Sequence, residues 1–221
     1  MARFAHGARP RQNVVQRDGV PTCSSGANSD RANSENVNDL FVALIHHPVV
    51  NRNAEIVTSA ITSLDIHDIA RASRTYDVRG VFIVHPIPEQ RKFAASVIDH
   101  WRFDFGRAHD SRRREALERV QIVAELDDAI AEASRISGAR PLIVHTSART
   151  EGGTSYADLR ARLARPDAPP MMILLGTGFG MSPEVAERAD IVLAPILGPG
   201  DYNHLSVRSA AGIILDRLRG K

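Results

Sequence analysis

A glycine-rich turn is the segment of this sequence whose residue types point most directly to ligand binding. Residues 173–180 read Ile-Leu-Leu-Gly-Thr-Gly-Phe-Gly, with three alternating glycines directly after an apolar run. A helix is expected to begin near Ser182, with Pro183 in its first turn. Glycine has no Cβ, so a glycine-rich backbone can turn sharply and approach a ligand closely. The pattern is typical of a cofactor-binding loop, although a purely structural turn would also explain it.

A dinucleotide-binding loop is one alternative for this turn. Such loops place their glycines in the pattern GxGxxG within a long series of strands and helices. Here the third glycine, Gly180, comes one residue early, and too little chain follows to build the remaining strands of that fold. The spacing therefore disfavours a Rossmann dinucleotide site.

A second loop with glycines and prolines, residues 195–210, runs into a long C-terminal helix. Asn203 is placed to cap that helix, and Ser206 and Arg208 fall within its first turns. Capping and a solvated first turn would explain these polar groups without any function. Their density beside a strand end favours a ligand site, because ligands in α/β sheets bind at such ends.

Ionisable residues also gather within residues 63–75, where the apolar positions predict a helix with one core-facing side. Asp65, Asp68 and Arg71 lie off that side, and Asp68 and Arg71 are three residues apart and able to pair. An exposed ion pair is the simplest explanation. Charged groups in the first turns of a helix could equally bind a phosphate or a reacting group.

Short apolar runs that alternate with amphipathic segments must position these loops. The runs lack polar alternation, as strands covered on both faces do, and they predict strands at 41–46, 81–84, 142–145, 171–175 and 191–193. The amphipathic segments predict helices at 64–76, 89–101, 113–119, 126–136, 156–163 and 203–218. The sequence therefore predicts an α/β fold with a mainly parallel sheet and helices on both faces.

Composition limits the chain to one globular domain with an appendage. Its 221 residues are 43% apolar and 24% charged, enough for one core. Residues 1–37 follow no helical or strand period, so we expect a disordered arm there and a folded domain at 38–221. The formal net charge is only +2, with 28 Lys and Arg against 26 Asp and Glu. Any nucleic-acid-binding surface must therefore be a local one.

Cysteine usage and the apolar runs bear on the compartment. The single cysteine, Cys23, has no intrachain partner, which excludes a disulfide framework and a thiol zinc cluster. Apolar runs such as residues 171–175 fall far short of the ~20 residues that cross a bilayer, and the N-terminus lacks an apolar signal core. We therefore expect a cytoplasmic protein without membrane contact.

Together these segments resemble the SPOUT (trefoil-knot) superfamily of RNA methyltransferases, and within it the bacterial group related to the tRNA guanine-N1 methyltransferases. The resemblance runs from about residue 41 to residue 218. It is carried, in the expected order, by VALIHHPVVNRNAEIVTSAITSLDIHDIARASRTYDV, LIVHTSAR, LLGTGFG and DYNHLSVRSAAGIILDRL. It implies methyl transfer from S-adenosylmethionine (SAM) to a tRNA or rRNA nucleotide, without a metal, and a C-terminal deep trefoil knot.

The resemblance also implies the residues that hold the methyl donor. In this family SAM lies bent in the knot against three loops, and a homodimer completes the site. The matching positions here are Thr146, Ser147, Ala148, Gly176, Thr177, Gly178, Ile196, Gly198, Asn203, Leu205 and Ser206. The apolar helix around Ile213, Ile214 and Leu218 has a face suited to the dimer.

The acceptor atom stays open between a guanine ring nitrogen and a ribose 2'-oxygen. Residues 65–78 align with a motif of the ribose-methylating branch, in which an Asn precedes an essential Arg by six residues. The matching residues are Asp65 and Arg71, so an Asp replaces the Asn. Gly178 stands where that branch usually has a Glu.

The acceptor loses a proton during transfer, so a basic group in hydrogen-bond reach would help. Arg71 stays charged and is better suited to phosphate binding or to transition-state electrostatics. Asp65, Asp201 and His204 are the candidate bases. Each has a structural alternative: a capping Asp, a turn Asp and a packed helix histidine.

A basic and aromatic strip, residues 100–114, interleaves three aromatic side chains with five arginines. It could hold phosphates and stack on an unpaired base, although its aromatics could instead end a helix in the core. We expect RNA contact from Trp101, Arg102, Arg107, Arg112, Arg113 and Arg114. Because the Glu at position 178 is absent, a noncatalytic RNA-binding or assembly factor that keeps the knot is an alternative. A methyltransferase acting on a protein or a small molecule would give this strip no role.

Overall fold

The computed structural model describes residues 38–103, 111–149 and 151–221. The expected arm at 1–37, with Cys23, lies outside the described residues, as does Arg107 of the basic strip.

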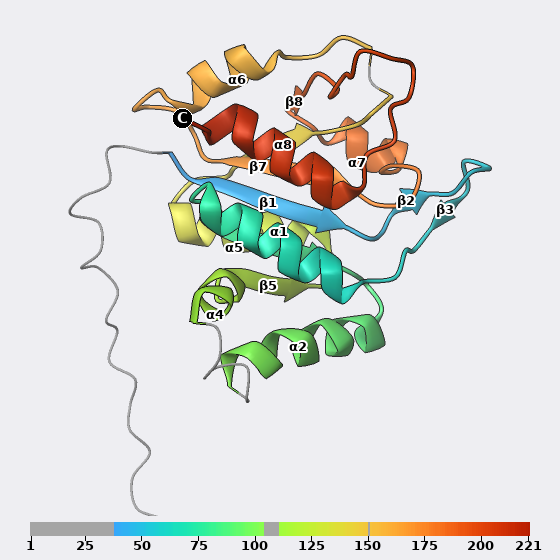
Figure 1. Ribbon diagram of the computed structural model, residues 1–221, viewed down its shortest axis with the longest axis vertical. Helices are drawn as coiled ribbons and strands as arrows, with labels where there is room; N and C mark the ends of the chain where they lie inside the picture. The colour runs from blue at the N-terminus through green and yellow to red at the C-terminus, as the bar shows by residue number, and fades with distance from the viewer. Residues whose placement is uncertain (1–37, 104–110, 150) are drawn as a thin grey trace, which may run out of the picture. The chain divides into compact units, whose positions relative to one another are not determined.

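Six parallel strands form the central sheet, in the order β5-β4-β1-β7-β6-β8 (Figure 1). They are β1 (Leu40–Ile45), β4 (Gly80–Val84), β5 (Val120–Val123), β6 (Leu142–His145), β7 (Met171–Gly176) and β8 (Ile191–Val192). The predicted parallel sheet is confirmed. The edge strand β5 was not predicted, because its four residues directly follow a segment whose pattern is helical.

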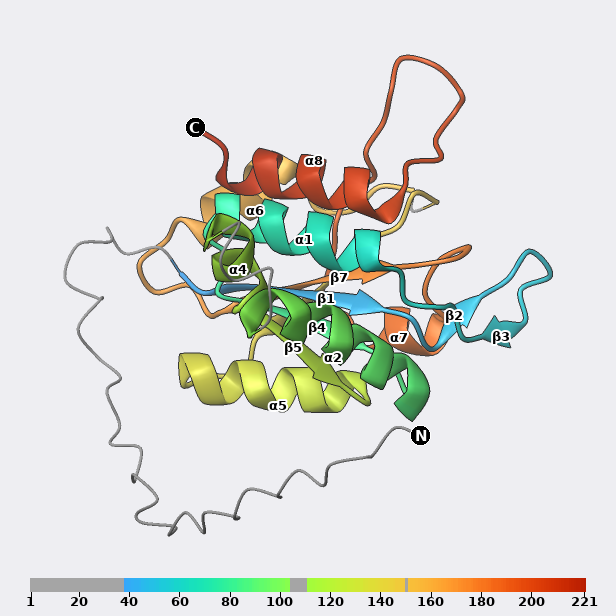
Figure 2. The ribbon, with the colours of Figure 1, turned by 60° about the horizontal axis from the view of Figure 1, so that its bottom comes forward.

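The sheet is covered on both faces (Figure 2). Along β1, Leu40, Val42 and Leu44 join one buried apolar cluster, and the alternate residues Phe41, Ala43 and Ile45 join the other. The first cluster includes residues of α1 (Ser63–Thr75), α2 (Pro88–Arg102), α4 (Ser111–Leu117), α6 (Tyr156–Leu163) and α8 (Val207–Arg219). The second includes residues of α5 (Leu126–Ser137) and α7 (Pro183–Glu187). Burial on both faces explains why the strands read as continuous apolar runs.

The chain reverses its direction across the sheet between β1 and β7. Helices α1 and α2 lie on one face where the chain steps from β1 toward the β5 edge, whereas α5 and α7 lie on the other face where it steps toward β8. Right-handed crossovers require this arrangement. The carboxyl ends of β1 and β7 therefore lead in opposite directions, and such a point is where open α/β sheets bind their ligands.

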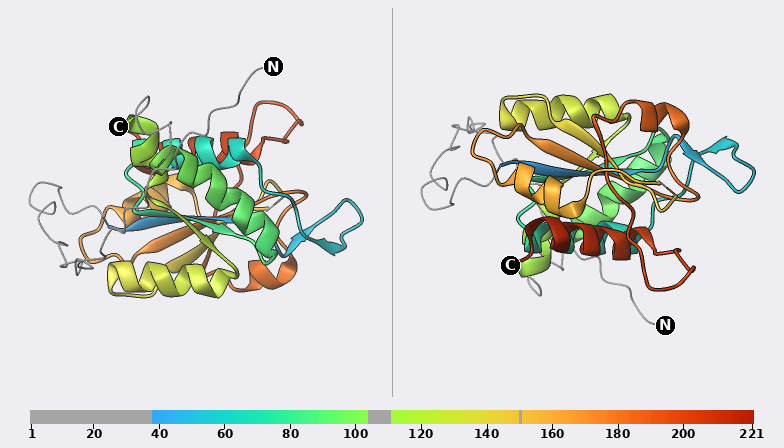
Figure 3. Two further views of the ribbon diagram at one scale, coloured as in Figure 1. Left: turned by 90° about the horizontal axis from the view of Figure 1, so that it is seen from below. Right: turned by 90° about the horizontal axis from the view of Figure 1, so that it is seen from above.

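A small hairpin precedes α1 and was not predicted. Its strands β2 (Val49–Val50) and β3 (Ile56–Val57) pair antiparallel. Val50 N donates to Gly180 O at 2.9 Å and Phe179 N donates to Val50 O at 3.1 Å, so β2 is bonded to the turn that follows β7. Figure 3 shows the hairpin projecting from the carboxyl end of the sheet.

Helix α8 differs from its prediction in two ways. Ser206 caps it by accepting from Ser209 N at 3.2 Å, so the helix begins four residues after Asn203 and the expected Asn203 cap is wrong. Ile214 and Leu218 are each 3% exposed and pack in the protomer's own core. These two side chains are therefore not available to a dimer partner.

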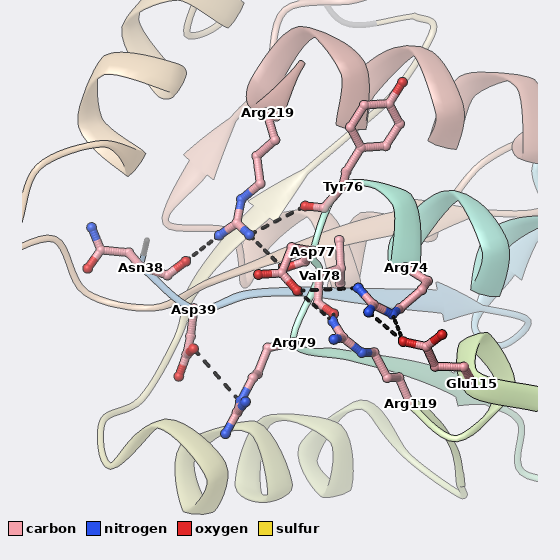
Figure 4. A network of polar contacts seen from close by, with 10 residues as sticks. All are labelled: Asn38, Asp39, Arg74, Tyr76, Asp77, Val78, Arg79, Glu115, Arg119 and Arg219. Carbon is pink, nitrogen blue, oxygen red and sulfur yellow. Dashed lines mark hydrogen bonds and ion pairs between the residues drawn. The ribbon is translucent and has the colours of Figure 1, made fainter. Parts of the chain in front are cut away.

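The amino end of the sheet is closed by an arginine network (Figure 4). The Arg219 guanidinium at the end of α8 donates to Asp77 O at 2.7 Å, to Tyr76 O at 3.5 Å and to Asn38 O. Arg119 donates to Asp77 Oδ1 at 2.9 Å and to Val78 O at 2.7 Å. Burial opposes ionisation of Asp77, but the hydrogen bond and charge of Arg119 outweigh it and lower its pKa. The network joins the chain's last helix to the start of β1.

Among the described residues, no helix has the length and apolarity that a membrane span needs.

Candidate active site

A cavity of about 720 Å³ lies where the loops after β6, β7 and β8 meet. Cavities that bind small molecules typically measure roughly 300–1,000 Å³. Ten of the eleven residues expected to hold the methyl donor line this cavity, and Gly198 is the exception. The structure thus brings together three loops that are up to 60 residues apart in the sequence, from Thr146 to Ser206.

The glycine turn after β7 needs glycine for two different physical reasons. A Cβ on Gly176 would lie 2.9 Å from Met181 Cγ and 3.1 Å from Met181 N, so a side chain there must displace the loop. Gly178 and Gly180 instead have φ values of +62° and +117°, which side chains rarely tolerate. The turn is therefore fixed by close packing at its start and by backbone conformation at its end.

A chain of hydroxyl groups anchors the same turn to β1. Thr177 Oγ1 donates to Ile45 O at 2.9 Å, and Ser59 Oγ lies 2.5 Å from Thr177 Oγ1. Because the Thr177 proton goes to the carbonyl, Ser59 is the donor to Thr177. Ser59 Oγ then accepts from His46 Nδ1, 2.9 Å away, which assigns the Nδ1 proton to His46. Thr177 and Ser59 both line the cavity, so the buried His46 supports the cavity wall through Ser59.

Two buried histidines lie behind this part of the cavity wall. His46 and His85 are both fully buried, with ring centroids 5.6 Å apart. Burial, and after it the neighbouring His85, lower the pKa of His46 to about 4, against the opposing charge of Asp65. Burial also lowers the pKa of His85, although its hydrogen bond to Ser59 O, at 3.0 Å, raises it. Both imidazoles are therefore neutral near pH 7.

The other two loops are tied to the sheet and to each other. Thr146 Oγ1 donates to Leu174 O at 2.7 Å, which joins the loop after β6 to β7. Asn203 Nδ2 donates to Ala148 O at 3.1 Å. Asn203, which was expected to cap a helix, instead links the loop before α8 to the loop after β6.

Three of the four candidate catalytic residues, Asp65, Asp201 and His204, line the cavity, and Arg71 does not. Asp65 is 6% exposed. Its Oδ2 accepts from Thr62 Oγ1 at 2.7 Å, and its Oδ1 accepts from Arg208 Nη1 at 2.9 Å. Both carboxylate oxygens therefore have protein partners, but the cap of α1 is Thr62, whose Oγ1 accepts from Asp65 N at 3.2 Å.

The expected Asp68–Arg71 pair is wrong. Asp68 Oδ2 lies 3.4 Å from Arg208 Nε, so Arg208 of α8 bridges both carboxylates of α1. By contrast, Asp201 and His204 are exposed at the cavity, and His204 contacts the ring of Tyr202 edge-on at 5.5 Å. Of the three candidate bases, these two are therefore the accessible ones.

The described part of the basic strip does not reach the cavity. Arg113 lies over the half-buried Trp101, with its guanidinium carbon 4.3 Å from the ring centroid. Arg102 donates to Leu117 O at 2.7 Å and to Val120 O at 3.0 Å, and Arg114 lies 3.4 Å from Glu118. RNA contact by this strip stays a prediction.

Sequence reasoning missed several cavity residues, notably Ser59, Arg149, Tyr156 and Phe179. Arg149 directly follows Ala148, and Phe179 directly follows Gly178. Their position next to the predicted loop residues could have identified them. Ser59 had none, because it reaches the site only through the unpredicted hairpin.

Comparisons with known proteins identify relatives of this chain. A family model described as "SAM-dependent RNA methyltransferase" matches residues 39–220. An uncharacterized protein of Aquifex aeolicus is 40% identical over 181 residues, which are 81% of this chain and 88% of that protein. A tRNA (guanine-N(1)-)-methyltransferase of Oleidesulfovibrio alaskensis is 40% identical over 182 residues, which are 82% of this chain but 42% of that enzyme. The chain thus spans less than half of that methyltransferase.

A solved structure from Neisseria gonorrhoeae, named as a methylase family protein, has a similar fold. Its TM-score is 0.58 at 17% sequence identity, and the match covers 87% of each chain. At this identity the likeness concerns the fold alone.

Proposed function

The chain belongs to the SAM-dependent RNA methyltransferase family, and we propose that it transfers the methyl group to a guanine ring nitrogen of tRNA. The observation that carries this proposal is the convergence of three loops on one cavity after β6, β7 and β8. The choice of tRNA and of the ring nitrogen rests on the 40% identity to a tRNA (guanine-N(1)-)-methyltransferase. A ribose 2'-oxygen is the alternative acceptor.

The cavity suits SAM in its size and in its mixed walls. Leu175, Ile196 and Ile214 supply apolar surface for a flat, partly apolar group, and Thr146, Ser147, Asn203 and Ser206 supply polar atoms. When bound, SAM supplies an electrophilic methyl group on a sulfonium. The task of the protein is then to align the methyl donor with the acceptor and to exclude water. Alignment can lower the activation free energy by several kcal/mol.

A proton must leave the acceptor nitrogen during transfer. We propose Asp201 or His204 as its acceptor, because both oxygens of Asp65 are bonded to Thr62 and Arg208. Asp65 then holds α1 against α8, and Arg208 keeps the start of α8 beside the cavity. Asp201→Asn and His204→Asn should separate the two, since only the loss of the true base lowers kcat with little change in the KM for SAM.

We further infer that the chain after β8 threads the loop after β6 and forms the knot. Leu193 N donates to His145 O at 2.9 Å on one side of the segment 192–194. On its other side, Thr154 N donates to Val192 O at 2.8 Å and Ala194 N donates to Thr154 O at 2.9 Å. Residues 192–194 therefore lie between His145 and Thr154, and this placement supports a threaded chain. Gly153 supports the close passage, because a Cβ there would lie 2.9 Å from Val192 O.

A homodimer is the proposed assembly. The loop before α8 keeps Leu197, Tyr202 and Leu205 at least 46% exposed, and exposed apolar side chains of this kind favour a protein partner. Light scattering coupled to size-exclusion chromatography should give twice the chain mass of 24.2 kDa.

Isothermal titration with SAM tests the donor site. Wild type should bind, and Gly176→Ala should bind about tenfold more weakly, because the new methyl group collides with Met181. Gly212→Ala is the matched control, since a Cβ at that position of α8 meets nothing within 4 Å. No binding by wild type would sink the proposal.

A noncatalytic RNA-binding factor is the second candidate, favoured by Gly178 at the position where the ribose branch has a Glu. Of the two functions, only the methyltransferase produces methylated RNA. Labelled methyl transfer into total RNA from a deletion strain rejects the binding factor, and nucleoside mass spectrometry of that RNA identifies the methylated atom.

A further inference from the structure

We propose that Phe179, Arg52 and Arg149 form an acceptor platform, on which the RNA base stacks against the Phe179 ring while the two guanidiniums bind flanking phosphates. This inference rests on the proposed function in taking RNA as the methyl acceptor. It assigns the acceptor to a surface that includes none of the residues of the basic strip.

The platform lies at the rim of the donor cavity. Phe179 and Arg149 both line the cavity, and the Phe179 side chain is 40% exposed. The guanidinium carbons of Arg52 and Arg149 lie 5.8 Å and 5.9 Å from the ring centroid. Arg52 comes from the hairpin and Arg149 from the loop after β6, so two separate segments flank one ring. A base stacked on this ring would lie next to Gly176 and Thr177 of the donor loop.

The exposure of Phe179 is built into the fold. Its backbone N donates to Val50 O at 3.1 Å, and Val50 N donates to Gly180 O at 2.9 Å. The flanking Gly178 and Gly180 have positive φ values, and a Cβ on Gly178 would lie 3.3 Å from Val50 O. The turn thus keeps a large apolar ring partly exposed to solvent, although full burial would be favourable. A fixed, exposed aromatic ring beside a cavity is suited to stacking.

The two arginines are available to a ligand. Within the described residues, neither Arg52 nor Arg149 forms an ion pair, and both are exposed. Their guanidiniums lie near the outer limit of about 6 Å for a cation–π contact, so they do not cover the ring closely. Arg113 differs, because at 4.3 Å it covers the face of Trp101. The Phe179 ring is therefore the more accessible stacking surface.

The chemistry of an RNA acceptor fits these groups. A base must be unstacked before its ring nitrogen can reach a donor in a cavity, and unstacked RNA bases commonly stack on aromatic side chains. Each such stack contributes about tenfold or more to affinity. Arginines on either side bind phosphates without reading the sequence. The platform therefore positions the nucleotide, and the cavity carries the reaction.

Fluorescence anisotropy with total tRNA from a deletion strain tests the platform without depending on methyl transfer. Phe179→Ala should raise the Kd for tRNA about tenfold, and Phe179→Trp should restore the wild-type value. SAM affinity, measured by titration calorimetry, should stay within about twofold. The matched control is Phe93→Ala, because Phe93 is 42% exposed on α2 and does not line the cavity.

The arginines are tested by salt dependence. Arg52→Gln should weaken tRNA binding and reduce the slope of log Kd against log salt by about 0.7–0.9, as expected for one lost phosphate contact. Arg162→Gln, an exposed arginine of α6 that does not line the cavity, should change neither quantity.

The possible results separate the platform from the proposed function. A wild type that binds tRNA through Phe179 but transfers no methyl group keeps the platform and rejects the proposed function. An unchanged tRNA Kd in Phe179→Ala overturns the platform even if methyl transfer is normal. A raised Kd for SAM with an unchanged Kd for tRNA also overturns it, because Phe179 would then contact the donor.

Discussion

The two ends of the parallel sheet differ in whether their arginine and aspartate side chains are all bonded within the protein. At the amino end, Arg219, Arg119 and Asp77 bond to one another or to backbone carbonyls. At the carboxyl end, Asp65 is also bonded, to Arg208, but Asp201 and Arg149 are exposed around a cavity of about 720 Å³. The same residue types thus stabilise the fold at one end and are accessible to a ligand at the other. The difference is whether these side chains already have hydrogen-bond or ion-pair partners within the protein.

The use of glycine follows the same division. The carboxyl end depends on Gly176, Gly178 and Gly180, whose conformations or close contacts exclude side chains. The amino end holds a comparable backbone conformation at Asp77, with φ of +49°, by bonding its side chain to Arg119. A left-handed residue can therefore be stabilised by bonds where no ligand must approach. Beside the cavity, glycine leaves the space open.

Removing Arg219 should have the largest effect and should be confined to the amino end. Arg219→Met leaves the carbonyls of Asn38, Tyr76 and Asp77 without this donor, so we expect a loss of about 3–4 kcal/mol of unfolding free energy. Urea unfolding measures it. SAM affinity of the folded fraction should not change. Arg165→Met is the control, because among the described residues the Arg165 side chain pairs only with the exposed Asp167, so its loss should cost less than about 1 kcal/mol.

Lowering the pH should have the next largest effect on stability. It should act through the buried His46, which lies behind the cavity at the carboxyl end. His46 has a pKa of about 4 in the folded protein against 6.5 in the unfolded chain. Between these pH values the unfolded chain binds a proton that the folded protein does not, so stability falls as the pH decreases. The contribution is about 3 kcal/mol, complete above pH 6.5 and lost below pH 4.

Urea unfolding at pH 7.5 and pH 4.5 measures this term, with His46→Gln as the comparison. The variant should lose part of the stability at pH 7.5, since Ser59 loses its donor, but its stability should depend less on pH. An equal pH dependence in both proteins would assign the effect to His85, His145 or the carboxylates instead. His85 and His145 also have pKa values lowered by burial, so some dependence should remain.

Sequence reasoning predicted the parts of this comparison that are local in the chain. The strands carry continuous apolar runs, and the glycine turn follows one of them directly, so both were evident. The resemblance to a known family supplied the three loops that line the cavity. The arginine network was not predicted, because Arg219 and Asn38 are 181 residues apart and no local pattern pairs them.

The errors at Asp68 and Asn203 arose because only the local partner of each residue could be predicted, whereas its actual partner is distant in the chain. Asp68 and Arg71 could pair within α1, but Arg208 lies 143 residues from Asp65 and bridges both aspartates. Asn203 could cap a helix, but Ser206 does so and leaves Asn203 free to bond Ala148. Phe179 was part of the predicted turn. Its role was not evident, because Arg52 approaches it through a hairpin whose pattern is too short to recognise.

The bond from Asn203 to Ala148 gives the smallest and most specific effect. Asn203→Ala removes one exposed hydrogen bond of 3.1 Å between the loop before α8 and the loop after β6, so stability should fall by less than about 1 kcal/mol. SAM affinity should fall about two- to fivefold, because the loops must then be ordered by the ligand itself. Titration calorimetry should show the loss as a less favourable entropy of binding. A large loss of stability with unchanged affinity would mean that Asn203 belongs with the bonded arginines of the amino end rather than with the open cavity.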